Sequence, residues 1–293
     1  MQIVSKGLSF TYNKKTEFNK RALRDVNLTI RDGDFFGIIG HTGSGKSTFI
    51  QHLNGLIPVQ EGEITVGDIT LTATKKKDKK VKENLKLLRS KVGMVFQYPE
   101  YQLFAETVFD DVAFGIKNFY PNKTQTEIEN DVKSAIERVG LNYYEVKHKS
   151  PFDLSGGQKR RVAIAGVLVT NPEVLILDEP VAGLDPVGKK QLMSILHDIH
   201  KTTVKTIIIV SHDMDEVLEN CNRIAVFNEG VVVSCDSPEN LFSSVEKLKA
   251  LRLDAPVTVK VAQKLQAVGV NLQTDYKIDD FIYAVKKAYL NLK

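Results

Sequence analysis

Apolar and polar positions follow two different periods along the chain, and together these periods predict a sheet with helices on its faces. Loose alternation over 7–12 and 22–30 predicts two strands in the opening third. The continuous apolar run 35–39 predicts a strand buried on both faces, entered through a hairpin turn signal at Asp32-Gly33. Three further apolar runs each follow a helical stretch, at 174–177, 206–210 and 223–227. Strands that alternate with helices in this way predict a parallel sheet.

The pattern also divides the chain into a main part and a C-terminal part. A helical pattern over 46–56 precedes a short predicted strand at 63–72. A turn at 228–230 is expected to fold the three valines after it back on the last strand. Beyond it the chain reads as helical pieces without a chemical motif. We therefore expect a main domain over 1–236 and a small helical appendage over 237–293, used for packing or for bracing a dimer.

Composition narrows the class of protein without changing this picture. The chain has 293 residues, 42% hydrophobic and 26% charged, which excludes collagen-like, low-complexity and wholly disordered chains. Its longest stretch without acids, Lys or Arg, Ser47 to Gln60, is shorter than the about 20 residues of a membrane span. The first residues do not form a secretory signal, and two cysteines are too few for a disulfide framework. We expect a protein that stays in the cytosol.

The net charge of +4 is too small to argue for a nucleic-acid partner, and none is expected. The positive charge is local, because lysines gather between Lys75 and Lys91. This stretch is interpreted as a solvated loop leading into a helix, and contact with anionic lipid headgroups is the alternative.

A glycine-rich loop follows the strand predicted at 35–39 and precedes a helix. The loop matches the pattern G-x-x-x-x-G-K-[ST], and Thr48 follows the matched residues. The matched residues are Gly40, His41, Thr42, Gly43, Ser44, Gly45, Lys46 and Ser47. Backbone N–H groups of such a loop and the positive end of the helix bind phosphate. Lys46 is expected to reach the β and γ phosphates of a nucleotide, Ser47 to hold Mg²⁺, and Thr48 to lie near the α phosphate. The alternative is an ordinary glycine turn that opens a helix.

Two acids end the apolar strand 174–177. Asp178 at the strand tip is expected to reach the metal ion, and Glu179 to polarise an attacking water molecule. Alone, the pair would be interpreted as a solvated strand end, but the loop around Lys46 makes the catalytic interpretation the better one. Both motifs would also fit other P-loop nucleotide hydrolases and nucleotide kinases.

A second anion-binding helix end distinguishes these classes. Leu154 is followed by Ser155, Gly156, Gly157 and Gln158, which head a predicted helix with Ser155 as its cap and two glycines that permit close backbone approach. The sequence here resembles the ATP-binding-cassette (ABC) ATPases, whose signature is LSGGQ. The family's marks occur in order over about residues 1–235: Tyr12, the loop 40–48, Gln97, 155–158, Asp178-Glu179, 183–185 and His212.

The resemblance implies a fold and an activity. The fold is an α/β P-loop ATPase core over 1–236 with an antiparallel β subdomain, a helical subdomain at about 98–168 and the helical appendage. The activity is hydrolysis of ATP with Mg²⁺, with Lys46, Glu179 and His212 as the catalytic residues. In this family the signature helix caps ATP held by another subunit. The chain has one copy of each half, so it is expected to pair with a paralogous ATPase or with itself.

The resemblance also assigns residues outside the two central motifs. Tyr12 is expected to stack on adenine, with Phe10 as the alternative, and Gln97 to contact Mg²⁺ and sense a membrane partner. His212 is expected to contact the γ phosphate. Asp185 is expected to link the two active sites of the dimer, although Ala182-Gly183 replaces the family's frequent Ser-Ala before Leu-Asp.

Segment 98–115 closely resembles the corresponding part of energy-coupling factor (ECF) transporter ATPases. The stretches 40–42, 162–166 and 179–186 and the appendage agree with it. The resemblance implies an importer of vitamins or other micronutrients, in which the ATPases lie on the cytoplasmic face of the cell membrane. They lie below a transmembrane coupling subunit that carries substrate-binding membrane subunits. Glu100 and Glu106 would receive arginines of the coupling subunit, unless both are simply solvated.

Alternatives of other classes remain. A non-ECF ABC importer, including a dedicated cobalt or nickel uptake system, would carry the same core motifs. A non-transport ABC ATPase is less favoured, because a chromosome-organising ATPase would have a long coiled coil between Lys46 and Ser155, and a translation factor would have two cassettes in one chain.

Overall fold

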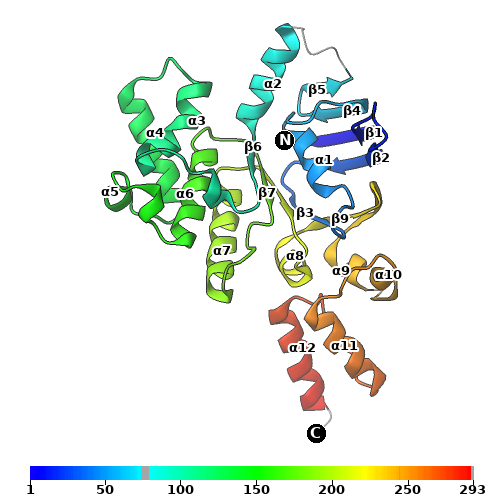
Figure 1. Ribbon diagram of the computed structural model, residues 1–293. Coiled ribbons are helices and arrows are strands. Elements are labelled where there is room, and N and C mark those ends of the chain that lie inside the picture. The colour runs from blue at the N-terminus through cyan, green and yellow to red at the C-terminus, as the bar shows by residue number, and fades with distance from the viewer. Residues whose placement is uncertain (74–78, 244, 292–293) are drawn as a thin grey trace.

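The computed structural model describes residues 1–73, 79–243 and 245–291, and its strands form two sheets (Figure 1). The first sheet is antiparallel and has the order β2-β1-β4-β5. Its strands are β1 (Ile3–Tyr12), β2 (Lys20–Ile30), β4 (Glu61–Val66) and β5 (Ile69–Thr72). The single strand predicted at 63–72 is wrong: a turn at Gly67-Asp68 divides it into β4 and β5, which pair with each other.

The second sheet lies at the centre of the molecule and has the order β10-β9-β3-β8-β7-β6. Its pairs are parallel except for that of β9 with β10, so the parallel sheet and the folded-back last strand are confirmed. The strands are β3 (Phe35–Ile39), β6 (Val92–Val95), β7 (Val174–Asp178), β8 (Thr206–Val210), β9 (Arg223–Asn228) and β10 (Val231–Asp236).

The hairpin expected at Asp32-Gly33 does not form. β2 pairs with β1 in the first sheet, whereas β3 pairs with β8 and β9 in the second, so this turn carries the chain from one sheet to the other. The reason is the continuous apolar run of β3, which needs cover on both faces. Phe36 and Ile38 pack into the core shared with the first sheet, and Phe35 and Ile39 pack into the core on the opposite face.

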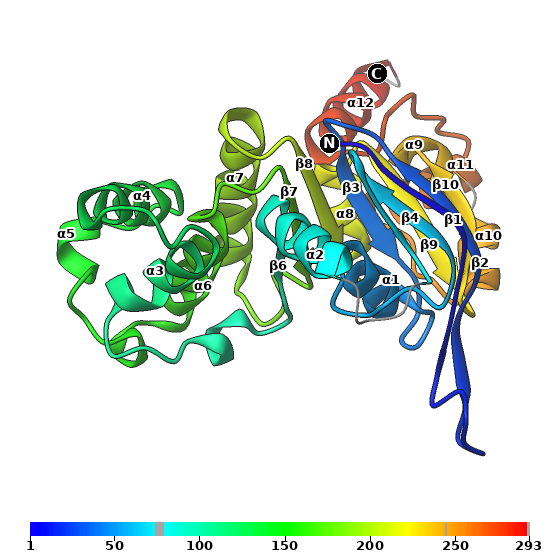
Figure 2. The ribbon, with the colours of Figure 1, turned by 90° about the horizontal axis from the view of Figure 1, so that it is seen from above.

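Helices cover both faces of the central sheet (Figures 1 and 2). α1 (Lys46–Leu53) and the first sheet share one core, whereas α7 (Pro186–Thr202) and α8 (Met214–Asn220) contribute to the other. α2 (Lys79–Lys91) is the helix expected after the lysine-rich loop, and residues 74–78 of that loop lie outside the described part.

A group of helices and short 3-10 turns lies beyond β6 and β7, on the left in Figure 1. It consists of η1 (Pro99–Gln102), α3 (Val108–Phe119), α4 (Gln125–Arg138), α5 (Tyr143–Val146), η2 (Pro151–Asp153) and α6 (Gly156–Leu168). The apolar faces of α3, α4 and α6 meet in a core that continues to the central sheet. In this arrangement α6, which begins in the stretch 155–158, and α1 lie on opposite sides of β6 and β7 (Figure 1).

The C-terminal part forms α9 (Pro238–Phe242), α10 (Val245–Ala250), α11 (Val257–Ala267) and α12 (Ile278–Asn291). Phe242, Leu248 and Val259 belong to the same core as one face of the central sheet. The division at residue 236 and the bracing role of the appendage stay predictions. Among the described residues, none of the helices is long and apolar enough to cross a membrane.

Gly37, in the middle of β3, tests how tightly the central sheet packs against α8. A Cβ atom at Gly37 would lie 2.8 Å from Cγ1 of Val217 and 3.0 Å from Sγ of Cys221, closer than normal contact. We expect Gly37→Ala to lower the free energy of unfolding by about 1–3 kcal/mol, because this core has no room for the added methyl group. Urea unfolding measures the change.

Gly166→Ala in α6 is the matched control, since the nearest atom to its added Cβ would be 3.9 Å away. Its free energy of unfolding is expected to stay the same or rise, because alanine favours a helix over glycine. Equal losses in the two variants would contradict the packing argument.

Candidate active site

The loop between β3 and α1 is held close to backbone from both sheets. A Cβ atom at Gly40 would lie 2.3 Å from the carbonyl oxygen of Phe227 in β9, and one at Gly45 would lie 2.6 Å from that of Ala22 in β2. Only glycine fits at these two positions, and both also have positive φ, 152° and 106°. No side chain caps α1, so its first N–H groups point into the loop and are available to an anion.

Lys46, the first residue of α1, lies across this loop. Its Nζ donates hydrogen bonds to the carbonyl oxygens of Gly40 (2.6 Å) and His41 (3.1 Å). Burial lowers the pKa of Lys46, and the charges of Glu179 and Asp178 oppose that shift. The ammonium group is therefore placed where a phosphate chain in the loop would pass, next to two carboxylates.

A pocket of about 220 Å³ opens beside the loop. It is lined by Tyr12, Lys20, Ala22, Gly43, Gly45, Lys46, Ser47 and Thr48. The Tyr12 ring is 38% exposed, and its hydroxyl lies 3.2 Å from Oγ1 of Thr48. Phe10, the alternative for contact with adenine, is only 7% exposed and belongs to the core. Of these two aromatic residues, Tyr12 therefore lines the pocket, and its stacking role stays a prediction.

His41 is not among the residues that line this pocket. Its Nδ1 lies 2.8 Å from the carbonyl oxygen of Thr42, and its Nε2 lies 3.1 Å from Oδ1 of Asn228 in the turn between β9 and β10. His41 thus ties the loop to the central sheet. Ser44 lies buried inside the loop, and its carbonyl oxygen accepts a hydrogen bond from the N–H of Gly230 in the same turn.

Asp178 and Glu179 lie at the carboxyl end of β7, beside the loop. Burial raises the pKa of Asp178, the neighbouring charge of Glu179 raises it further, and the hydrogen bond with Ser47 and the charge of Lys46 oppose these effects. The structure thus brings together Lys46, Ser47 and both acids. Among the described residues, no group of three or more His, Cys, Asp and Glu side chains is arranged to hold a metal ion alone.

Glu179 has a left-handed backbone, with φ 51°, which is costly for a residue other than glycine. Its N–H donates to the carbonyl oxygen of Val210 at the end of β8 (2.9 Å), which fixes this conformation against the sheet. Its Oε2 lies 2.7 Å from Nδ1 of His212, which follows β8. The imidazole is 75% exposed and the carboxylate 14%, so the pair joins a solvent-facing ring to a mostly buried acid.

The stretch 155–158 is the start of α6. Ser155 and Gln158 form a reciprocal cap, in which each side chain accepts a hydrogen bond from the other residue's backbone N–H. A Cβ atom at Gly156 or Gly157 would have no other atom within 4 Å, so packing within this chain does not require glycine at either position. None of these residues lines the pocket at Lys46. The structure therefore does not bring the two predicted phosphate-binding helix ends together within the chain.

Gln97 and Asp185 lie in loops after strands. Gln97 is exposed and follows the end of β6 closely. Asp185 caps α7, since its Oδ1 accepts a hydrogen bond of 2.6 Å from the N–H of Gly188. Asp185 therefore stabilises the start of α7 within the chain. Its expected role in linking the two active sites of a dimer stays a prediction.

Glu100 in η1 is already paired. Its two carboxylate oxygens accept hydrogen bonds from Nη2 and Nε of Arg160 in α6, at 3.2 and 3.3 Å. Nη1 of Arg160, whose side chain is 4% exposed, donates to the carbonyl oxygens of Pro180 and Ala182, both at 2.9 Å. Glu100 is therefore not simply solvated, whereas Glu106 is exposed. Arg160 links η1 and α6 to the turn after Glu179, a role that the sequence analysis missed.

Glu216 in α8 was also missed. Its Oε2 accepts a hydrogen bond of 2.8 Å from the hydroxyl of Ser211, the residue before His212, and the same hydroxyl accepts one from the N–H of Asp213. Burial raises the pKa of Glu216 to about 7, and the charges of Asp213 and Glu179 add to the shift. The sequence carries one usable signal, an acid four residues after His212 on a predicted helix, but no signal for its burial.

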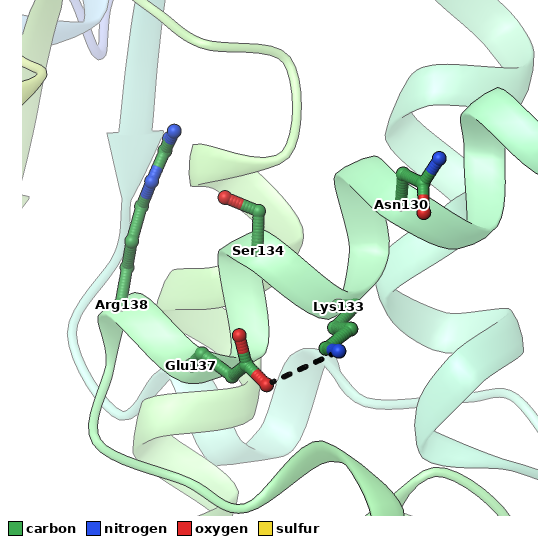
Figure 3. A pocket seen from close by; sticks show the side chains of 5 residues that line it. All are labelled: Asn130, Lys133, Ser134, Glu137 and Arg138. Atoms are coloured by element: carbon green, nitrogen blue, oxygen red, sulfur yellow. Dashed lines mark ion pairs between the residues drawn. The ribbon is translucent and has the colours of Figure 1, made fainter.

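A different hollow lies on α4, lined by Asn130, Lys133, Ser134, Glu137 and Arg138 (Figure 3). Lys133 and Glu137 form an ion pair of 4.0 Å on this face. The hollow has about 430 Å³, more than the pocket at Lys46, but the residues of the phosphate loop and of the catalytic pair do not line it. We therefore place the active site at the loop of Lys46.

Comparison with known proteins identifies the class. A family model described as ABC transporter matches residues 23–182. The chain is 49% identical over 276 residues to the energy-coupling factor transporter ATP-binding protein EcfA2 of Clostridioides difficile (strain 630), which covers 94% of this chain and 93% of that protein. It is 46% identical over 273 residues to the protein of the same name from Enterococcus faecalis, covering 93% and 92%.

Solved structures agree with the sequence relatives. The structure of cbiO1 from Clostridium perfringens, part of the ABC transporter complex cbiONQ, matches with a TM-score of 0.73 at 35% identity and covers 91% of this chain and 96% of that one. A dimeric post-hydrolysis state of the ATP-binding cassette MJ0796, bound to ADP and Pi, matches with a TM-score of 0.70 at 29% identity and covers 80% and 98%.

The chain therefore belongs to the ABC transporter family of ATP-binding proteins. Within this family it is an ATP-binding subunit of the energy-coupling factor type. The predicted ABC fold, the predicted binding and hydrolysis of ATP for transport, and the preference for the ECF type over other ABC ATPases are confirmed. The roles assigned to single residues stay predictions.

The raised pKa of Glu216 predicts how the stability of the protein depends on pH. Between about pH 4.5 and 7 the folded protein keeps a proton on Glu216 that the unfolded chain has released. The contribution of Glu216 to the free energy of unfolding therefore falls as the pH rises through this range. We expect Glu216→Gln, which cannot ionise, to gain stability relative to the unchanged protein between pH 5 and pH 8, on the order of 2–3 kcal/mol.

Urea unfolding of both proteins at pH 5 and pH 8 measures this difference. All other ionisable groups are shared, so the change in the difference between the two pH values isolates Glu216. A difference that is the same at both pH values would contradict the account.

Proposed function

We propose that this chain is the subunit that binds and hydrolyses ATP in an ECF-type importer, and that it energises the uptake of vitamins or other micronutrients through membrane partner subunits. One observation carries the catalytic part: Lys46, Asp178, Glu179 and His212 lie together beside a loop shaped to hold phosphates. The name of the relatives supports the transport part.

The reaction is the attack of water on the γ phosphorus of ATP. N–H groups of the loop and the ammonium of Lys46 would stabilise the negative charge that develops on the phosphate oxygens. Glu179 would orient the water and accept its proton. Its left-handed backbone and its bond with His212 hold the carboxylate in one place, so little reorganisation is needed before attack.

The residues present fit a magnesium ion. Mg²⁺ prefers oxygen ligands, and it is commonly held by one or two carboxylates together with substrate phosphates. Ser47 and Asp178 share a hydrogen bond, which places a hydroxyl and a carboxylate side by side, and Gln97 offers an amide oxygen. These three side chains would hold the ion next to the phosphates. The bound ion would neutralise phosphate charge.

Pairing of two ATPase subunits would complete the site. Within this chain the start of α6 stays apart from the pocket at Lys46, and the glycines at its tip leave open space above them. A phosphate held by another subunit could approach the N–H groups there, near Ser155, Gly156, Gly157 and Gln158. The dimeric MJ0796 cassette is a relative in which two copies associate. A paralogous ATPase is the favoured partner, and a second copy of this chain is the alternative.

Membrane subunits would bind around η1 and the start of α3. Tyr101, Phe104 and Phe114 expose large aromatic rings there, and Glu106 is exposed beside them. Such a surface fits a partner helix that carries apolar and basic side chains. We propose a transmembrane coupling subunit at this place, with substrate-binding membrane subunits attached to it. The ATPase would then lie on the cytoplasmic face of the cell membrane.

The variant Glu179→Gln tests the catalytic proposal. Glutamine keeps the size of the side chain but cannot accept a proton, so we expect the rate of ATP hydrolysis to fall by about 100-fold or more while ATP binding persists. ATP that is bound but not hydrolysed should also hold two subunits together. Phosphate release and size-exclusion chromatography with Mg²⁺-ATP measure the two effects.

Glu83→Gln on α2 is the matched control, since Glu83 is exposed and lies outside the site. Its rate and its elution are expected to match the unchanged protein. Hydrolysis by Glu179→Gln within twofold of the unchanged protein would overturn the assignment of Glu179.

A further inference from the structure

His52 is a buried polar residue that the proposed mechanism does not use. It lies on α1, one turn beyond Thr48, and its side chain is fully buried. Its Nδ1 lies 2.7 Å from the carbonyl oxygen of Thr48. Its Nε2 is buried and has no hydrogen-bond partner among the described residues. An apolar side chain could fill this volume without leaving a nitrogen unsatisfied, so the presence of histidine needs a reason.

The geometry fixes the state of the imidazole. A carbonyl oxygen only accepts, so Nδ1 carries the hydrogen and Nε2 carries the lone pair. Burial lowers the pKa of His52, and the hydrogen bond to Thr48 opposes that shift only in part. Burial therefore favours the neutral form of the ring. Its bond to the helix backbone holds the plane of the ring at one angle, which an aliphatic side chain could not do.

The imidazole begins a closed circuit of contacts that returns to Thr48. The centroids of His52 and Phe10 are 4.9 Å apart, with the rings at 76°. Those of Phe10 and Tyr12 are 4.8 Å apart, with the rings at 83°. Both are edge-to-face arrangements, which aromatic pairs favour. The circuit closes where the hydroxyl of Tyr12 meets Oγ1 of Thr48 at 3.2 Å.

This circuit ties an exposed ring on β1 to the helix that follows the phosphate loop. The Phe10 ring contacts the rings of both His52 and Tyr12, whereas the other side of the circuit runs through hydrogen bonds to Thr48. Phe10 is buried, so its ring cannot turn without displacing one of its neighbours. Removing the flat ring at 52 would free Phe10 to tilt, and the Tyr12 ring that rests on Phe10 would lose its fixed angle over the pocket.

We propose that His52 is a positioning residue for the base of the bound nucleotide: through Phe10 it holds the Tyr12 ring at the angle at which adenine stacks on it. The inference rests on the proposed function, in which Tyr12 contacts adenine. The inference predicts that His52 contributes to the binding of the base and not to that of the phosphates. The reason is that His52 bonds to the carbonyl of Thr48 and not to the N–H groups that face the phosphates.

Two variants remove the ring and the hydrogen bond one at a time. His52→Asn keeps a donor near the position of Nδ1 but removes the ring, and His52→Phe keeps a ring but removes the donor. For each full-length variant, titration calorimetry measures the dissociation constants of Mg²⁺-ATP and of inorganic tripolyphosphate, which has no base. We expect ATP to bind about tenfold more weakly to both variants and tripolyphosphate to bind within twofold of the unchanged protein.

His197→Asn is the matched control. His197 is half-buried on α7 and also hydrogen-bonds, to Asn220 (2.8 Å). It also contacts a phenylalanine, with ring centroids 4.6 Å apart, but this residue, Phe35, belongs to the core on the opposite face of the sheet. Both dissociation constants are expected to stay within twofold in this variant. A thermal unfolding curve for each variant shows that the protein compared is folded.

The results separate this inference from the proposal on which it rests. Equal losses of ATP and tripolyphosphate binding in the His52 variants would overturn the positioning role, since they would show a general disturbance of the loop. Unchanged ATP binding in both His52 variants, with a loss in Tyr12→Ala, would overturn it while leaving Tyr12 as the adenine contact. Unchanged ATP binding in Tyr12→Ala itself would overturn the assignment of Tyr12 in the proposed function.

Discussion

The close approach of two loop glycines to backbone from both sheets is the constraint on which the active site depends. A Cβ atom at Gly40 would clash with the carbonyl of Phe227 in the central sheet, and one at Gly45 would clash with that of Ala22 in the antiparallel sheet. The loop 40–45 therefore packs closely against backbone of both sheets, and the packing of the sheets restricts its shape. Because the two-sided burial of β3 sets the position of the central sheet, the same apolar run that forms the core also places the N-terminus of α1.

The catalytic groups depend on the parallel strands beside this loop. β7 and β8 are parallel and end at the same edge of the central sheet. Glu179 and His212 follow these two strand ends and lie within hydrogen-bond distance of each other. The strain in the backbone of Glu179 is held by the neighbouring strand, through Val210, and by the turn whose carbonyls bond to Arg160. Arg160 also binds Glu100 in η1, so the surface proposed to receive the membrane subunits is joined to the catalytic turn by one buried side chain.

Much of the fold and the local motifs could be predicted from the sequence, because they depend on neighbouring residues. The strand 206–210 and the helix start at Lys46 are found where the pattern places them. The hairpin at Asp32-Gly33 was wrong because a turn signal does not say which sheet the next strand joins. The pair of Glu100 with Arg160, the burial of Glu216 and the contact of His52 with Phe10 could not be predicted, since each joins residues from different elements whose approach only the packed structure decides.

The central claim is that this chain serves a membrane transporter as one of two ATPase subunits. Its most direct test is purification of the tagged full-length chain from its native membranes in mild detergent, with identification of every co-purified protein by mass spectrometry. The account predicts a paralogous ATPase, one large membrane protein and several small, mutually unrelated membrane proteins. Recovery of soluble partners alone, with no membrane protein, would contradict it.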